Sequence, residues 1–308
     1  MSGDALILTL LTVITAATPL LFAALGELVT EKSGVLNLGV EGMMLVGAVC
    51  SFAFVQWTGS AWLAIIGGML AAMLMALIFA FITLTLQAAQ VATGLALTIF
   101  GIGISALLGQ DLVGIAYAGL PDIKLPFLSD LPVVGELLFR HDGLVYLSFI
   151  MVLAVSWFLY RTRAGLILRA VGDSHDAAHA IGFSVIRIRY MATLFGGAMS
   201  GLAGAYLSLA YSPMWVEGMS AGRGWIALAL VVFATWRPLR VLLGAYLFGG
   251  ITILQLHGQA LGISVPSQFM SMLPYIATIV VLVFISRDRN RIKLNAPACI
   301  AKPFHPAA

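Results

Sequence analysis

Polar residues able to do chemistry in apolar surroundings first gather in the stretch GELVTEKSGVLNLGVEGMMLVG, residues 26–47. Asn37 and Glu41 lie there in an apolar run that three glycines interrupt. A carboxylate inside a membrane span is costly, so it usually faces a partner or a water-filled cavity. Glycines in such a run favour an interrupted span whose free backbone groups line a pathway. Three roles for Glu41 stay open: an interfacial side chain that reaches water, a cap between helices, or direct contact with a solute.

A short repeat adds a second carboxylate of the same kind. The residues Val-Glu-Gly-Met occur at 40–43 and again at 216–219, so Glu217 matches Glu41. Internal repeats in membrane proteins often place broken helices at matching positions, although four residues also match by coincidence. The candidate pathway residues are Asn37, Glu41, Met44 and Glu217.

The loop 161–189 carries the pattern His175-Asp-Ala-Ala-His179, which places two imidazoles four residues apart. The zinc motif HExxH uses this spacing, but its base is a longer Glu, and no third ligand is evident here. The chain also has no CxxC pair, and two cysteines are too few for a disulfide framework. The pattern therefore favours a solvated loop helix, and we predict neither a metal site nor a catalytic site.

The composition explains which elements must position these residues. Of the 308 residues, 61% are hydrophobic and 9% are charged, with a mean hydropathy of +1.04. A soluble domain has about 45–50% apolar and about 25% charged residues, so the composition excludes a soluble enzyme, a disordered chain and a disulfide scaffold. The net charge of +3 does not indicate nucleic-acid binding, because the basic residues lie in loops that flank apolar runs.

Apolar runs of about 20 residues predict an all-α, polytopic transmembrane bundle of about nine spans, within a range of about eight to ten. The bundle is expected to contain discontinuous helices, because the seventh run is short and starts beside Arg223. We predict one membrane domain over residues 1–295 and a mobile cytoplasmic tail over 296–308. The predicted spans are 5–28, 35–55, 61–86, 91–109, 142–160, 190–211, 222–236, 241–257 and 268–286.

The distribution of basic residues predicts the orientation. With alternating spans, all but three of the 16 Lys and Arg residues fall on one side of the membrane. The positive-inside rule makes that side cytoplasmic, which places the amino terminus outside and the carboxyl terminus in the cytoplasm.

Several segments resemble one family. The stretch GELVTEKSGVLNLGVEGMMLVGA closely resembles the hallmark of permease subunits of ATP-binding-cassette (ABC) importers, in the branch that serves nucleosides and simple sugars. Ribose-type and branched-chain amino-acid permeases are its relatives. Residues Pro126–Phe139 look like the outer loop of the nucleoside-type branch, and the loop from Asp176 to Gly182 is similar to the EAA---G core of importer coupling loops.

The resemblance implies a permease subunit that moves nucleosides, nucleobases or simple sugars across the inner membrane of a bacterium by alternating access. It implies four kinds of partner: an ATP-binding subunit, a second and different permease subunit, an extracytoplasmic substrate-binding protein, and membrane lipid. ATP and Mg would bind the partner subunit, because this chain has no Gly-Lys pair and hence no Walker A loop. The chain itself is therefore not expected to be an enzyme. A coupling helix is expected near Gly172–Gly182, and the residues expected to dock the ATP-binding subunit are Arg169, Asp176, Ala177, Ala178 and Gly182.

Two other classes remain as alternatives. An ion-coupled secondary transporter of a small polar solute usually buries several ionisable residues at mid-membrane, whereas Glu41 is the main candidate here. A membrane-embedded enzyme needs a nucleophile with its base, or a metal, and neither constellation is evident.

Overall fold

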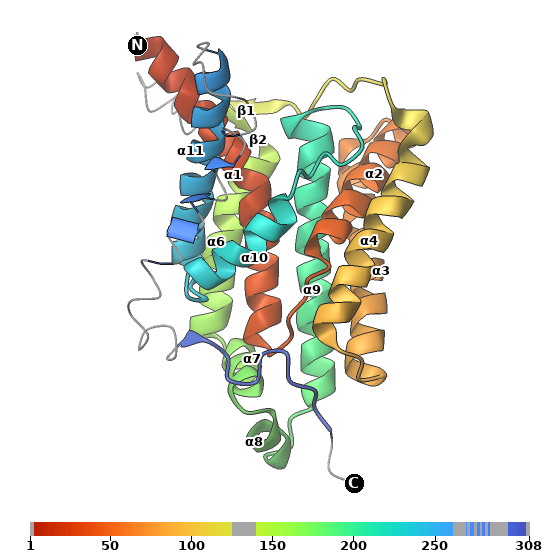
Figure 1. The fold of residues 1–308 in the computed structure, drawn as a ribbon, viewed down its shortest axis with the longest axis vertical. Helices are drawn as coiled ribbons and strands as arrows, with labels where there is room; N and C mark the ends of the chain where they lie inside the picture. Colours follow the sequence, from red (N-terminus) through yellow and green to blue (C-terminus); the bar gives the residue numbers. More distant parts are fainter. Residues whose placement is uncertain are drawn as a thin grey trace.

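A computed structural model describes residues 3–124, 140–260 and 295–305, with a few single positions between 269 and 283. Nearly all of the described elements are helical (Figure 1). The α-helices are α1 (Gly3–Lys32), α2 (Val40–Thr58), α3 (Ala61–Ala80), α4 (Gln90–Gly109), α6 (Gly143–Arg161), α7 (Arg163–Asp173), α8 (His175–Ala180), α9 (Val185–Tyr206), α10 (Arg223–Phe233) and α11 (Pro238–Ala260). The remaining elements are the π-helical turns Phe81–Thr85 and Leu207–Tyr211, the 3-10 turn Gln110–Leu112, and the strands β1 (Asp122–Lys124) and β2 (Arg140–Asp142).

Seven helices in the described residues are long and apolar enough to cross a membrane. They match seven of the predicted spans, and they include α1, α2, α3, α4, α6, α9 and α11. The predicted span 222–236 is a single helix of 11 residues, α10, which is about 16 Å long and cannot cross a bilayer core of about 30 Å. The predicted span 268–286 lies outside the described residues except for single positions, so a total of about nine is not confirmed.

Local sequence explains where several helices begin and end. Asp142 starts α6, because its carboxylate accepts hydrogen bonds from Leu144 N at 2.9 Å and Val145 N at 3.2 Å. Gly59 ends α2 in a left-handed conformation with φ +68°, and its N–H donates to Val55 O at 2.9 Å. Both caps satisfy backbone groups that a helix end otherwise leaves without partners.

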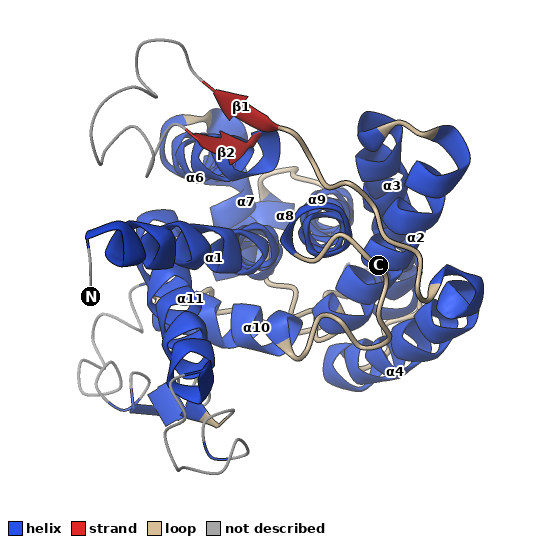
Figure 2. Cartoon of the chain, turned by 90° about the horizontal axis from the view of Figure 1, so that it is seen from above, coloured by secondary structure: helices blue, strands red, loops and turns tan. Residues whose placement is uncertain are grey.

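The centre of the bundle is α9, which lies between α1 and the pair α2–α3 when the molecule is seen from above (Figure 2). In the most apolar part of the α9 span, 83% of the residues are buried, whereas 28% are buried in the most apolar part of the α4 span. Small residues allow the close contact: a Cβ on Gly201 would lie 2.6 Å from Gly68 O, and one on Gly47 would lie 2.6 Å from Gly201 Cα. Lipid-embedded helices associate through such packing, since lipid tails are as apolar as their side chains.

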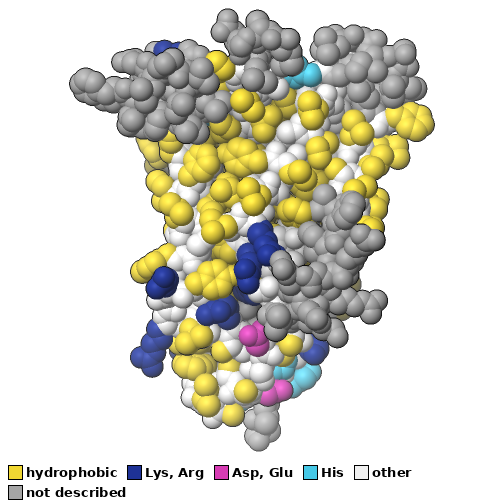
Figure 3. Space-filling view, turned by 90° about the vertical axis from the view of Figure 1, so that its left-hand side faces the viewer, with side chains coloured by type: hydrophobic (Ala, Val, Ile, Leu, Met, Phe, Trp, Pro, Cys, Tyr) yellow, Lys and Arg dark blue, Asp and Glu magenta, His cyan; other side chains and the backbone are white. Residues whose placement is uncertain are grey.

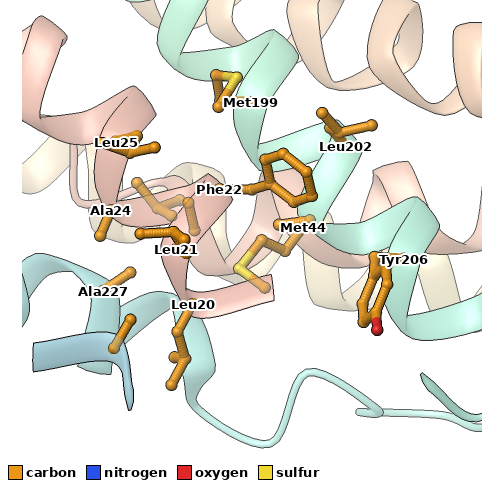
Figure 4. Packing of buried hydrophobic residues seen from close by; sticks show 14 of the residues in the cluster. Leu20, Leu21, Phe22, Ala24, Leu25, Met44, Met199, Leu202, Tyr206 and Ala227 are labelled. Carbon is orange, nitrogen blue, oxygen red and sulfur yellow. The ribbon is translucent and has the colours of Figure 1, made fainter. Parts of the chain in front are cut away.

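Larger side chains fill the space beside these glycines. Leu21, Phe22 and Met44 converge with Leu202 and Tyr206 between α1, α2 and α9 (Figure 4). All five are buried, so their dispersion contacts hold the three helices together.

One element departs from the all-helical prediction. Strands β1 and β2 form an antiparallel pair in which Asp122 faces Asp142 and Ile123 faces His141. The predicted outer-loop segment Pro126–Phe139 lies outside the described residues.

The surface divides into two zones along the long axis. In one side view, apolar side chains cover the upper part, and most of the visible Lys and Arg gather in the lower part (Figure 3). Helices α7 and α8 and residues 295–305 lie at the lower end, opposite the start of α1 (Figure 1).

The described part of the segment predicted as a mobile tail has specific partners. Cys299 N donates to Gly172 O at 2.9 Å, and Ala301 N donates to Gly34 O at 3.1 Å. Its mobility in solution is not tested by these contacts and stays a prediction.

Candidate functional site

Two interrupted segments approach the interior of the bundle from opposite ends (Figure 1). Residues 33–39 leave the lower end of α1 without helical structure, and α2 begins inside the bundle at Val40. Residues 212–222 leave the upper end of α9 and its π turn in the same way, and α10 begins at Arg223. The predicted discontinuous helices are therefore present at both places.

The first interruption is buried, so its backbone groups need partners from outside a helix. Side chains of other helices and of the segment itself supply them, at distances of 2.8 to 3.0 Å. The bonds are Leu36 N to Gln90 Oε1, Asn37 N to Glu27 Oε1, Gly39 N to Asn37 Oδ1, and Thr98 Oγ1 to Leu38 O. These polar side chains hold a non-helical chain inside the bundle.

Glu41 joins the two interrupted segments. Its side chain is only 5% exposed, and both oxygens accept hydrogen bonds from the start of α10. Ser220 Oγ and Gly222 N donate to Oε1 at 2.6 and 2.8 Å, and Gly224 N donates to Oε2 at 2.6 Å. Because Glu41 also lies in the first turn of α2, its carboxyl group lies at two helix amino termini, where helix dipoles favour negative groups.

The structure thus brings the two Val-Glu-Gly-Met copies close together, but the Glu41 carboxylate is buried and the Glu217 side chain is exposed. The second copy ends at Met219, directly before Ser220, which is the first donor to Glu41. Glu217 itself is exposed. Of the roles considered for Glu41, the geometry matches the inter-helix cap, and direct contact with a solute stays a prediction.

The other two candidate pathway residues are fully buried. Asn37 Nδ2 lies 3.5 Å from Met43 Sδ, and its Oδ1 accepts from Gly39 N. Met44 points into the core beside Phe22 (Figure 4). Asn37 therefore shapes the interrupted segment through its own side chain, whereas Met44 packs in the core.

Sequence reasoning missed two further carboxylates, Glu27 and Glu31, which are each 1% exposed on α1. Glu27 accepts from the backbone of the interruption, and Glu31 accepts from Trp236 Nε1 at 2.5 Å. Trp236 follows α10 with φ +53°, an uncommon conformation for a bulky residue. Two acids four residues apart inside an apolar run are the signal that could have identified them.

The candidate coupling residues lie at the lower end of the molecule. Ser174 caps α8 by accepting from Ala177 N at 3.3 Å, and Gly182 follows the helix with φ +92°. Ala177, Gly182 and Asp176 are exposed, and 83% of the Asp176 side chain is accessible. Ile181, at 72% exposure, extends the same small face.

Two of the predicted coupling residues face elsewhere. Ala178 is buried against Phe304 and Val171, so it supports α8 from below its exposed face. Arg169 is half-buried on α7, and its guanidinium lies 5.3 Å from the Tyr160 ring centroid, within the range of a cation–π contact. The exposed residues of α8 and the turn after it that a partner could contact therefore include Asp176, Ala177, Ile181 and Gly182, beside His179 and Ala180.

Both histidines of α8 contact the ring of Phe304. The centroid of the Phe304 ring lies 5.3 Å from the centroid of the His175 ring and 5.3 Å from that of the His179 ring, and both contacts are edge-on. Within residues 3–124, 140–260 and 295–305, no three His, Cys, Asp or Glu side chains cluster as metal ligands would.

Known proteins are similar in sequence to this chain over most of its length. The family model described as "Branched-chain amino acid transport system / permease component" matches residues 9–282. The putative glucose ABC transporter permease protein TsgC13 of Haloferax volcanii is 42% identical, over 94% of this chain and 95% of that protein.

Two relatives carry nucleoside names. The nucleoside ABC transporter permease protein NupC of Lactococcus lactis subsp. cremoris is 34% identical, over 86% of this chain and 88% of that protein. The guanosine ABC transporter permease protein NupQ of Bacillus subtilis is also 34% identical, over 88% and 90%. The chain belongs to this permease family and is a membrane-spanning permease subunit of an ABC transporter.

Proposed function

We propose that this subunit imports a neutral solute that bears a sugar ring, either a nucleoside or a simple sugar. The names of the relatives support this class, because one is a putative glucose permease and two are nucleoside or guanosine permeases. A sugar ring is the group that these cargoes share. The observation that carries the proposal is the full-length similarity to all three.

The interrupted segments are the proposed place of the pathway. Unwound backbone and half-helix ends at mid-membrane are the usual site of solute passage in transporters. Here the helix starts of α2 and α10 meet at Glu41, close to Asn37 and Met44. We assign Glu41 the task of keeping these starts together while the surrounding helices tilt.

The ATPase is proposed to dock on the exposed face of α8. Small residues such as Ala177 and Gly182 allow close approach, and Asp176 offers a charge to a basic group on the partner. ATP and Mg would act on that separate subunit. Closure of two ATPase subunits would push α8 and tilt the helices that it contacts. This tilting would open the pathway to one side of the membrane and close it to the other, so ATP bound to the partner subunits would drive alternating access.

Orientation and assembly complete the proposal. The lower end, with α7, α8 and residues 295–305, faces the cytoplasm, and the amino terminus lies outside the plasma membrane. A second, different permease subunit forms the other half of the pathway. A substrate-binding protein delivers the cargo from outside, and membrane lipid surrounds the bundle.

Co-purification tests the class of transporter. The tagged chain is isolated in mild detergent, and the proteins that accompany it are identified by mass spectrometry. We expect an ATP-binding subunit and a second permease. A chain that purifies alone and moves solute in liposomes under an ion gradient would contradict the proposal.

Reconstitution then separates the two cargoes. The complete complex in liposomes is supplied with its binding protein and with either tritiated guanosine or radiolabelled glucose, with and without internal ATP. ATP-dependent uptake of one of them confirms the class and identifies the branch. Uptake of neither, with ATP hydrolysis that neither stimulates, would refute the proposed cargo class.

A further inference from the structure

Residues 295–305, which we name the carboxyl-terminal strap, lie between α8 and the first interrupted segment. We propose that the strap is a mechanical link that makes residues 33–39 follow the movement of α8. The inference rests on the proposed docking of the ATPase at α8, and it adds a part of the chain to which sequence reasoning gave no role in transport.

One side of the strap is bonded to the last two residues of α7, directly before α8. Cys299 N donates to Gly172 O at 2.9 Å, and Cys299 Sγ lies 3.5 Å from Asp173 O. A Cβ on Gly172 would lie 2.2 Å from Lys32 O and 3.2 Å from Pro297 Cβ, so the last residues of α7 pack on the end of α1 and on the strap together. A shift of the end of α7 therefore displaces the strap.

The other side of the strap is bonded to the end of α1 and the start of the interruption. Ala301 N donates to Gly34 O at 3.1 Å, and Lys32 Nζ donates to Asn295 O at 2.6 Å. Gly34 has φ +89°, and a Cβ there would lie 3.2 Å from Cys299 O, so the strap sits directly on this turn. The interruption thus begins at a turn that the strap holds.

Arg189 connects the same three parts from within. The side chain is 1% exposed, and burial of a guanidinium is costly unless its nitrogens have partners. Its Nε donates to Ser33 O at 3.2 Å, its Nη1 donates to Lys302 O at 3.1 Å, and its Nη2 lies 3.2 Å from His175 Nδ1. One rigid, planar group therefore contacts the interruption, the strap and α8.

Phe304 fixes the end of the strap beneath α8. Its ring is 7% exposed and lies edge-on to His175 and His179, while its carbonyl oxygen accepts from Gln87 Nε2 at 3.2 Å. The ring belongs to a small apolar cluster with Val171, Ala178 and Val185. This cluster gives α8 a buried side that is made partly from the strap.

The link can be tested by uncoupling it without removing the docking face. Phe304→Ala deletes the ring beneath α8 and changes no exposed residue of that helix, and His305→Ala changes the exposed neighbour as a matched control. Both are compared with the unmodified chain in the complete, reconstituted transporter. Tritiated guanosine and radiolabelled glucose are the cargo probes, and the readout is cargo moved per ATP hydrolysed.

We expect Phe304→Ala to retain the ATPase subunit and cargo-stimulated hydrolysis, and to reduce cargo moved per ATP by about fivefold or more, the lower range of a typical coupling between sites. His305→Ala should leave the ratio unchanged. An unchanged ratio in Phe304→Ala would overturn the link, and so would equal loss of hydrolysis and uptake. If the unmodified complex itself shows no cargo-stimulated hydrolysis, the proposed function has failed and not the strap.

A second measurement covers the case in which Phe304→Ala assembles poorly. Phe304→Leu keeps an apolar side chain in the cluster but loses the ring edges. Hydrogen exchange of residues 33–39 is followed with and without nucleotide in the assembled complex. We expect a nucleotide-dependent change in the unmodified chain that is weakened in Phe304→Leu. The same change in both, or rapid exchange throughout 295–305 in the unmodified chain, would overturn the inference.

Discussion

At the scale of single residues, Glu41 shows how one carboxylate can accept hydrogen bonds from the backbone groups that a break in a membrane span exposes. The interruption before α10 leaves backbone N–H groups without helical partners, and lipid supplies none. Two of these groups and the Ser220 hydroxyl donate to the two oxygens of Glu41. An ionised carboxylate is suited to this task because both of its oxygens accept hydrogen bonds.

Glu41→Gln tests this role, because an amide has only one acceptor oxygen. One buried N–H of α10 then loses its acceptor, and the free energy of unfolding in mixed detergent should fall by about 1–3 kcal/mol. Glu217→Gln makes the same change at the exposed copy and should alter stability by less than about 0.5 kcal/mol. A Glu41→Gln chain with unchanged stability and lost uptake would instead support direct contact with cargo.

His175 adds a pH dependence at the same scale. Burial and the neighbouring Arg189 guanidinium lower the pKa of His175, and Lys302 acts in the same direction, whereas Asp176 opposes them. The unfolded chain therefore binds this proton at a higher pH than the folded chain, so stability at α8 declines as pH falls below about 6.5.

Hydrogen exchange checks this sign. After correction for intrinsic rates, protection of residues 295–305 should decrease as pH is lowered through about 6.5. His175→Gln should flatten the dependence, whereas His179→Gln should retain it. A dependence that survives in His175→Gln would assign the effect to another group.

At the scale of elements, α8 combines a buried side that packs on the strap with an exposed side of small residues and one acid. Asp176→Arg replaces an exposed side chain whose charge partner among the described residues is His175, with Asp176 Oδ1 3.5 Å from His175 Nε2, so the free energy of unfolding should fall by no more than about 1 kcal/mol. Recovery of the ATPase subunit should fall at least about tenfold, the effect of roughly 1.4 kcal/mol in binding.

Glu217→Arg is the matched control, because it reverses an exposed acid in the segment that precedes α10. It should recover the ATPase subunit as well as the unmodified chain does. Normal recovery and normal uptake with Asp176→Arg would remove α8 from the docking surface.

At the scale of the whole molecule, α8 lies at the lower end of the bundle (Figure 1), and most of the Lys and Arg visible in one side view lie in the lower part (Figure 3). Orientation is tested with single cysteines in a chain whose Cys50 and Cys299 are replaced by serine. Ile181→Cys at the lower end should react with a membrane-impermeant maleimide only after the membrane is opened. Gln56→Cys, exposed near the end of α2, should react in intact cells. The reverse pattern would invert the proposed topology.

The sequence by itself determined the class of this protein. Apolar length predicts which segments are helices in a membrane, because each helix satisfies its own backbone groups locally. Seven of the nine predicted spans, the shortness of the run after Arg223 and an interruption near Gly34 and Gly39 followed from residues that are neighbours in the chain. The permease family followed from the motif near Glu41 and is confirmed by the relatives.

Only the tertiary structure decided which residues meet across the chain. Glu41 and Gly224 are 183 positions apart, and Lys32 and Asn295 are 263 apart, so no local period relates them. The strap illustrates the difference most clearly: its composition predicts a tail, whereas its partners on α7, α8 and α9 and at Lys32 and Gly34 are brought to it only once the helices have packed. Local physics sets where helices form, and long-range packing of small residues sets which polar groups they bring together.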